Sequence, residues 1–128
     1  MRLLLDTHAL IWWLAGDRSL SAAARRAVTD LSNEVFVSAV SAWEIATKYR
    51  IGKLPEAQAL AADVGGAIAG QGFVGLPITG PHGQAAGSLP GPHRDPFDRM
   101  LIAQATLGDL VLVSNEAVFD RYGVRRLW

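Results

Sequence analysis

Cysteine is absent from the 128 residues, which excludes disulfide bonds, thiolate metal sites and thiol nucleophiles. The chain also has no excess of either charge, with 12 basic against 12 acidic residues. Proteins that bind nucleic acid are usually basic, so this balance at first argues against a nucleic-acid partner. No apolar run reaches the roughly 20 residues of a membrane span, and Asp6 interrupts the first one too early for a signal peptide. We therefore expect a soluble cytoplasmic protein without a membrane partner.

Half of the residues are hydrophobic, enough to build one core at this length. Three short apolar runs are predicted to be strands buried on both faces: residues 3–5, 35–37 and 110–113. They alternate with segments of helical spacing: residues 10–14, 22–31, 42–49 and 97–107. Because parallel neighbours need a crossover connection, this alternation predicts an α/β fold, with a central parallel sheet flanked by helices in one domain over residues 1–128.

The middle of the chain has a different composition. Nine of the 13 glycines lie between Gly65 and Gly91, together with three prolines. We interpret this stretch as irregular chain inside one domain, because neither flank alone has enough strands to close a core. Residues 73–78 form a further candidate strand within it, and residues 124–128 form a candidate edge strand.

Four acidic residues lie at or near the carboxyl ends of the predicted strands, where parallel sheets bind ligands. Asp6 ends the first strand, Glu44 comes soon after the second, and Glu116 follows the third. Asp98 lies in the first turn of the helix that leads into the third strand. In a parallel sheet, all four carboxylates would lie at the same edge.

Three of these acids also have a structural interpretation. Glu44 fits a capping box that begins at Ser41, and Asp98 complements the dipole of its helix. Glu116 could start a helix. Asp6 has no such alternative, because the following residues offer no obvious cation to offset the desolvation of its carboxylate.

Converging carboxylates need a cation or raised pKa values. Two of them about 4 Å apart repel by roughly 4 kcal/mol at an effective dielectric constant near 20. With oxygen ligands alone, Mg²⁺ or Mn²⁺ fits better than zinc. Such sites typically catalyse phosphoryl chemistry, in which the ion polarises the phosphate and activates a bound water.

Five segments resemble the PIN-domain ribonuclease toxins of VapBC-type toxin–antitoxin modules: LLLDTHALIWWL, VFVSAVSAWEIATKYRIGKL, GFVGLPIT, LPGPHRDPFDRMLIAQA and LVLVSNEAVFDRYGV. The resemblance extends over nearly the whole chain, from Arg2 to Trp128. It implies a small α/β/α sandwich and an Mg²⁺- or Mn²⁺-dependent endoribonuclease activity. It further implies an RNA substrate cut to a 5′-phosphate and a 3′-hydroxyl, a cognate antitoxin that blocks the site, and a homodimer.

The family's site residues carry over by position. Its three catalytic, metal-binding acids fall on Asp6, Glu44 and Asp98, the last because it precedes the LIAQA helix at the family spacing. The fourth metal ligand, commonly Asp, falls on Glu116, whose longer side chain can still ligate through water. The resemblance also implies a supporting hydroxyl near Ser114 and a polar residue at Asn115.

Other polar residues flank the acids. His8 and His93 either contact substrate or serve as structural polar residues around the site. Arg99 directly follows Asp98 and is a candidate to pair with it or to hold a phosphate. The candidate substrate-binding residues are therefore Arg99, His93, Ser114 and Asn115.

Two further groups have more than one interpretation. Three basic residues near the end of the Glu44 helix either grip RNA or stabilise the helix C-terminus: Lys48, Arg50 and Lys53. Three tryptophans are expected mostly to fill the core, with part of their surface buried against a partner: Trp12, Trp13 and Trp43.

Three functions compete on this pattern. The first is a metal-dependent endoribonuclease toxin of a type II toxin–antitoxin system. The second, a signalling receiver domain, needs paired acids after the first strand and a late Lys, whereas Asp6 stands alone and the last Lys is Lys53. The third is a catalytically degenerate PIN module that binds RNA or antitoxin without cleavage, an alternative that Glu116 keeps open.

The zero net charge does not decide against RNA. If the four acids belong to a cation site, 12 basic residues remain against 8 acidic ones, which gives the rest of the protein a charge of +4. A modest positive rim around a metal-filled cleft suits a polyanion. Nonspecific phosphate binding should nevertheless be weak.

Overall fold

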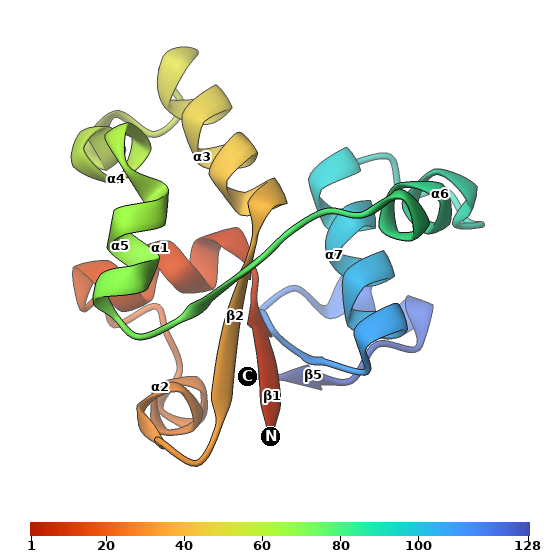
Figure 1. Cartoon of the computed structure of the whole chain (residues 1–128), viewed down its shortest axis with the longest axis horizontal. Helices are drawn as coiled ribbons and strands as arrows, with labels where there is room; N and C mark the ends of the chain where they lie inside the picture. Colours follow the sequence, from red (N-terminus) through yellow and green to blue (C-terminus); the bar gives the residue numbers. More distant parts are fainter.

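Five parallel strands form the centre of the computed structural model, which describes residues 1–128 (Figure 1). The strands are β1 (Arg2–Leu5), β2 (Glu34–Ser38), β3 (Val74–Leu76), β4 (Val111–Val113) and β5 (Arg126–Leu127). The α-helices are α1 (Thr7–Ala15), α2 (Ala22–Thr29), α3 (Ala39–Arg50), α4 (Gln58–Ala62), α5 (Val64–Gly70), α6 (Gly80–Ser88) and α7 (Pro96–Gly108). Two short 3₁₀ helices complete the chain: η1 (Pro55–Ala57) and η2 (Ala117–Tyr122). No helix is both long enough and apolar enough to cross a membrane.

Strand β1 shows why the predicted strands lack polar alternation. Leu3 and Leu5 point into a core shared with α1, α2 and α5, whereas Leu4 points to the other face, into a core shared with α7 and η2. All three leucines are fully buried. Helices cover both faces of the sheet (Figure 1), so the inner positions of β1 and β2 need apolar side chains, while Arg2 and Glu34 are exposed at the strand starts. The predicted α/β/α sandwich is confirmed.

The predicted elements are largely present. The apolar runs form β1, β2 and β4, residues 73–78 contain the shorter strand β3, and β5 lies at the sheet edge. Helix α3 begins at Ala39, three residues before the predicted start, because the Ser38 side chain caps it by accepting from the Val40 amide.

The glycine-rich middle was wrongly interpreted as irregular chain, since it contains α5, β3 and α6. Helix α6 forms despite its four glycine and proline residues because its start is well capped. Thr79 and His82 form a capping box, and Pro81 lies in the first turn, where a missing N–H costs no helical hydrogen bond.

The strand order places a switch point beside β1. The sheet runs β3-β2-β1-β4-β5, so the chain adds strands first on one side of β1 and then on the other. Crevices at the carboxyl ends of strands beside such a switch point are where open parallel sheets bind ligands. Asp6 follows β1 and Ser114 follows β4 at this place.

Candidate active site

Asp6 joins the end of β1 to the start of α1. Its side chain caps α1, because Oδ1 accepts a hydrogen bond from the Ala9 amide at 2.8 Å. Burial raises the pKa of the Asp6 carboxyl, with only partial offset from the Ser114 hydroxyl, the Ala9 amide and His8. The expectation that Asp6 has no structural role is wrong, since an Asp directly before an apolar helical segment is itself a cap signal.

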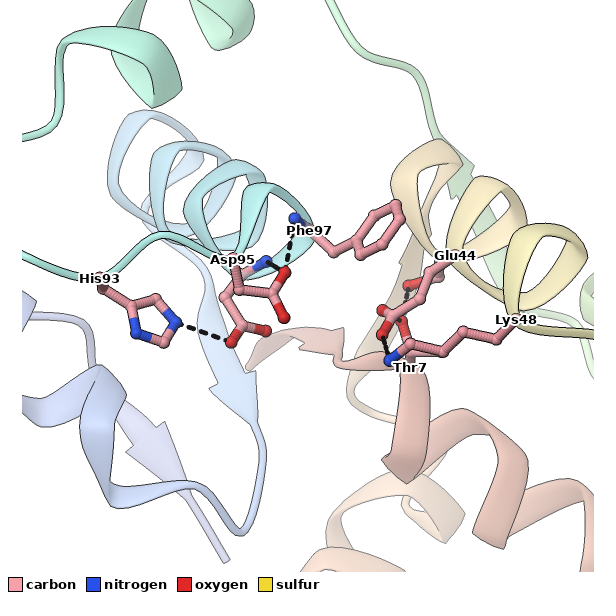
Figure 2. A network of polar contacts seen from close by, with 8 residues as sticks. Thr7, Glu44, Lys48, His93, Asp95 and Phe97 are labelled. Carbon is pink, nitrogen blue, oxygen red and sulfur yellow. Dashed lines mark hydrogen bonds and ion pairs between the residues drawn. The ribbon is translucent and has the colours of Figure 1, made fainter. Parts of the chain in front are cut away.

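Glu44 lies in the second turn of α3, so the capping-box interpretation is excluded. The residue is 5% exposed, and the Thr7 hydroxyl donates to Oε1 at 2.5 Å. The ammonium group of Lys48 binds the other oxygen, Oε2. Figure 2 shows this carboxylate held between α1 and α3 by the two partners.

Asp98 lies in the first turn of α7, as predicted, but another residue caps the helix. Asp95 accepts from the backbone amides of Phe97 and Asp98 at 2.9 and 3.2 Å. The Asp98 carboxylate instead contacts Nε2 of His93 at 2.8 Å. Burial is the main cause that raises the pKa of Asp98 to about 6; the charges of Asp95 and Glu116 act in the same direction, and the hydrogen bond from His93 opposes them.

Glu116 follows β4 and precedes η2. Its backbone amide donates to the Ser114 hydroxyl at 3.0 Å, while its side chain makes no capping hydrogen bond. Glu116 therefore lies at the start of a short 3₁₀ helix, as one interpretation predicted, but its side chain does not cap that helix. The Glu116 charge contributes to the raised pKa values of both Asp6 and Asp98, which places the three acids within electrostatic reach of one another.

The structure thus brings the predicted acids to one edge of the sheet without packing them into a cage. No group of three or more His, Asp or Glu side chains stands close enough to hold a metal ion. Figure 2 shows Glu44 and Lys48 on α3, across from Asp95 and His93 at the start of α7. The four-acid ligand set remains a prediction.

The donor chemistry of this edge nevertheless fits a divalent cation. Every candidate donor is a carboxylate oxygen, the ligand type that Mg²⁺ and Mn²⁺ prefer. The raised pKa values of Asp6 and Asp98 show that burial disfavours their negative charge and that the protein only partly compensates it. A bound cation would supply this compensation.

Sequence reasoning missed the contacts of the two residues that hold Glu44 in place, Thr7 and Lys48. The spacing of Lys48, four residues after Glu44 on one helix, was a usable signal for an ion pair. Lys48 also lies in the last turn of α3, as the helix-stabilising interpretation expects, but its ammonium group is bound to Glu44. Arg50 and Lys53 are exposed, and both of their interpretations stay open.

Arg99 has a structural task that the sequence did not indicate. Its guanidinium group donates to the backbone carbonyls of Ala86 and His93 at 3.0 and 2.9 Å, and also to the carbonyl of Leu89. It makes no ion pair with Asp98, contrary to one of the two expectations. Arg99 therefore ties the segment between α6 and α7 to the helix.

The remaining candidate residues differ in how deeply they are buried. Ser114 is fully buried beside Asp6, whereas Asn115 is exposed. Trp12 and Trp13 are partly buried against the core, as expected. Trp43 is 58% exposed and contacts Phe97 edge-on, with 4.8 Å between ring centroids.

Comparison with known proteins gives consistent matches. The PIN domain family matches residues 3–125. A stretch of 31 residues is 58% identical to Ribonuclease VapC16 of Mycobacterium tuberculosis, covering 24% of this chain and only 22% of that protein.

Two solved structures share the fold over nearly the full length. A chain of VapBC2 from Rickettsia felis, solved with a DNA fragment from its promoter, has a TM-score of 0.71 at 15% identity, covering 98% of this chain and 97% of that one. VapC20 of Mycobacterium tuberculosis, a Sarcin-Ricin loop cleaving toxin, has a TM-score of 0.68 at 16% identity, covering 95% of each chain.

Proposed function

Since this chain belongs to the PIN-domain family, we propose that it is a metal-dependent endoribonuclease toxin of a type II toxin–antitoxin system. The observation that carries the proposal is the pair of acids at the switch point, Asp6 and Asp98, whose pKa values are both raised by burial. Perturbed acids gathered in one place are typical of catalytic sites. The ribonuclease name of the Mycobacterium tuberculosis relative and the RNA cleavage by VapC20 add support.

Four residues would hold the cation, Mg²⁺ or Mn²⁺: Asp6, Glu44, Asp98 and Glu116. When bound, it polarises the scissile phosphate and lowers the pKa of the attacking water. Attack forms a bond from the water oxygen to phosphorus and breaks the bond to the 3′-oxygen, which takes up a proton. The products are a 5′-phosphate and a 3′-hydroxyl.

The protein's own part is to fix these oxygens before substrate arrives. The cap on α1 orients Asp6, and the Thr7 hydroxyl orients Glu44. Fixed positions of this kind spare the reaction the cost of ordering its groups. His93 holds the Asp98 carboxylate in place through Nε2.

The proposal includes partners. Solved relatives include VapBC complexes, from which we propose a cognate antitoxin that covers the acids. A homodimer is proposed on the exposed ring of Trp43, since aromatic residues are enriched in interfaces. We treat residues 1–128 as one PIN domain that acts in the cytoplasm.

One alternative has an observation in its favour. No three acidic side chains lie close enough together to hold a metal ion, and Lys48 already binds Glu44. The second candidate is therefore a degenerate PIN module that binds RNA or antitoxin without cutting. Incubation of structured RNA with Mn²⁺ or Mg²⁺, with and without EDTA, separates the two. Cleavage that EDTA abolishes supports the enzyme, and intact RNA under every condition supports the binding module.

A further inference from the structure

A cavity of about 430 Å³ lies between the segment that precedes α7 and the helix η2. Residues 90–93 form one wall, and Val118, Arg121 and Tyr122 form the other. Prolines and a valine make most of the surface apolar, while Tyr122 contributes an aromatic ring and Arg121 a positive charge. The volume lies within the range of small-ligand sites.

The cavity adjoins the acids through His93. This residue lines the cavity while its Nε2 contacts the Asp98 carboxylate at 2.8 Å. Its ring centroid is 6.4 Å from that of Tyr122. A molecule in the cavity would therefore lie beside Asp98, next to the edge where the acids gather.

The wall formed by residues 90–93 depends on a glycine. Gly91 has a φ of +100°, and a Cβ at this position would lie 3.0 Å from the Tyr122 hydroxyl oxygen. Glycine thus allows the backbone to approach the edge of the tyrosine ring. Tyr122 is also partly buried against the second core, so its ring is held in a fixed place beside the cavity.

The charge of Arg121 is available to a ligand. The residue is exposed and makes no ion pair or side-chain hydrogen bond in the structure. The neighbouring acid, Asp120, is already bound by Arg126 through two hydrogen bonds of 2.9 and 3.0 Å. Arg121 therefore has no internal anion to neutralise it.

We propose that this cavity binds one unstacked nucleobase of single-stranded RNA, the nucleotide adjacent to the scissile phosphate. The ring of Tyr122 stacks on the base, and Arg121 binds the backbone phosphate of the same nucleotide. Aromatic stacking combined with a basic group is the usual way that proteins hold unpaired RNA bases. This inference rests on the proposed function, because the acids define where the phosphate lies.

The test uses the full chain in EDTA, where cleavage plays no part. The four 5′-nucleoside monophosphates are titrated into ¹⁵N-labelled protein, with ribose 5-phosphate as the probe that lacks a base. We expect amide shifts at Gly91, Val118 and Tyr122 with at least one nucleotide, and clearly smaller ones with ribose 5-phosphate, which offers Arg121 a phosphate but Tyr122 no base. Tyr122→Leu should weaken binding about tenfold, as for loss of a stacked base, whereas Tyr122→Phe should retain it.

A second variant covers the case in which Tyr122→Leu loses its fold. Arg121→Gln changes an exposed residue and should weaken nucleotide binding several-fold, while Arg26→Gln, the same change at an exposed position on α2, should not. Equal shifts with ribose 5-phosphate, or no shifts with any nucleotide, would overturn the base-binding cavity. So would unchanged binding by Arg121→Gln.

Failure of this inference can be told apart from failure of the proposed function. If the protein cleaves RNA but nucleotides cause no amide shifts at the cavity, only the base-binding proposal is rejected. Shifts at the cavity in a protein that cleaves no RNA reject the enzyme while retaining the base-binding site.

Discussion

The ammonium group of Lys48 binds the carboxylate of Glu44 one turn earlier on α3, at the edge where the acids gather. Burial by itself would lower the pKa of Lys48, but the bond to Glu44 and the charges of Asp95 and Asp98 raise it overall. Lys48 therefore stays charged and acts as a built-in counter-ion. A divalent cation that enters this edge would compete with it for Glu44.

Replacement of Lys48 should test this competition. In EDTA, Lys48→Gln leaves the buried Glu44 without its cation and should lower the free energy of unfolding by about 1–2 kcal/mol. With Mn²⁺ present, its melting temperature should rise more than that of the unmodified protein, because no ammonium group occupies Glu44. Calorimetry of both proteins, with Arg50→Gln as the exposed control on the same helix, measures this. An equal metal response in both would show that Lys48 does not compete.

Metal binding should stabilise the fold through the acids. At a metal concentration 100 times Kd, Mg²⁺ or Mn²⁺ should raise the melting temperature by roughly 5 °C or more. Asp98→Asn removes one proposed ligand and should shrink this rise. Asp109→Asn is the matched control, since Asp109 is highly exposed and asparagine tolerates its left-handed backbone, φ 51°. If metal raised the melting temperature of Asp98→Asn as much as that of the unmodified protein, the metal would bind at another site.

Stability without metal should depend on pH through Asp98. Its pKa is raised from 3.8 to about 6, so the folded protein holds a proton that the unfolded chain has released. Stability should therefore fall as pH rises from about 4 to 6. Asp98→Asn lacks this titration and, in EDTA, should be more stable than the unmodified protein at pH 7.5 by about 1–2 kcal/mol after allowance for screening.

Urea unfolding at pH 4, 5, 6 and 7.5 provides the comparison. The raised pKa of Asp6 acts in both proteins and cancels in the difference between them. A stability difference that stays constant across this range would show that the Asp98 carboxyl is not destabilised by burial.

Arg99 should behave as a structural residue. Arg99→Lys keeps the charge but loses most of the hydrogen bonds to the carbonyls of Ala86, Leu89 and His93, and should lower the free energy of unfolding by about 2 kcal/mol. Arg94→Gln, at an exposed neighbour, should leave stability unchanged. If Arg99→Lys instead kept full stability and weakened RNA binding, the earlier expectation of a phosphate ligand would stand.

The sequence was informative where a residue's neighbours along the chain determine its environment. The run Leu3–Leu5 is buried on both faces, and its apolar continuity predicts that directly. The position of Asp98 in the first turn follows from Pro96, which marks the helix start. Both inferences use local chemistry alone.

Contacts between distant segments could not be predicted in this way. The Thr7 hydroxyl meets Glu44 only because α1 and α3 pack together, 37 residues apart in sequence. Arg99 turns to carbonyls between α6 and α7, whose placement depends on helix α6 forming in a glycine-rich stretch. The side-chain partners that hold the acids therefore needed the structure.

Cleavage of a structured RNA in Mn²⁺ tests the central claim most directly. The unmodified protein should cut it to products with 5′-phosphate ends, EDTA should abolish cutting, and Asp6→Asn, Glu44→Gln and Asp98→Asn should each lose at least about 100-fold in rate. Asp109→Asn should cut at the full rate. Equal cleavage by the unmodified protein and the three acid variants would contradict the assignment of these acids to the reaction.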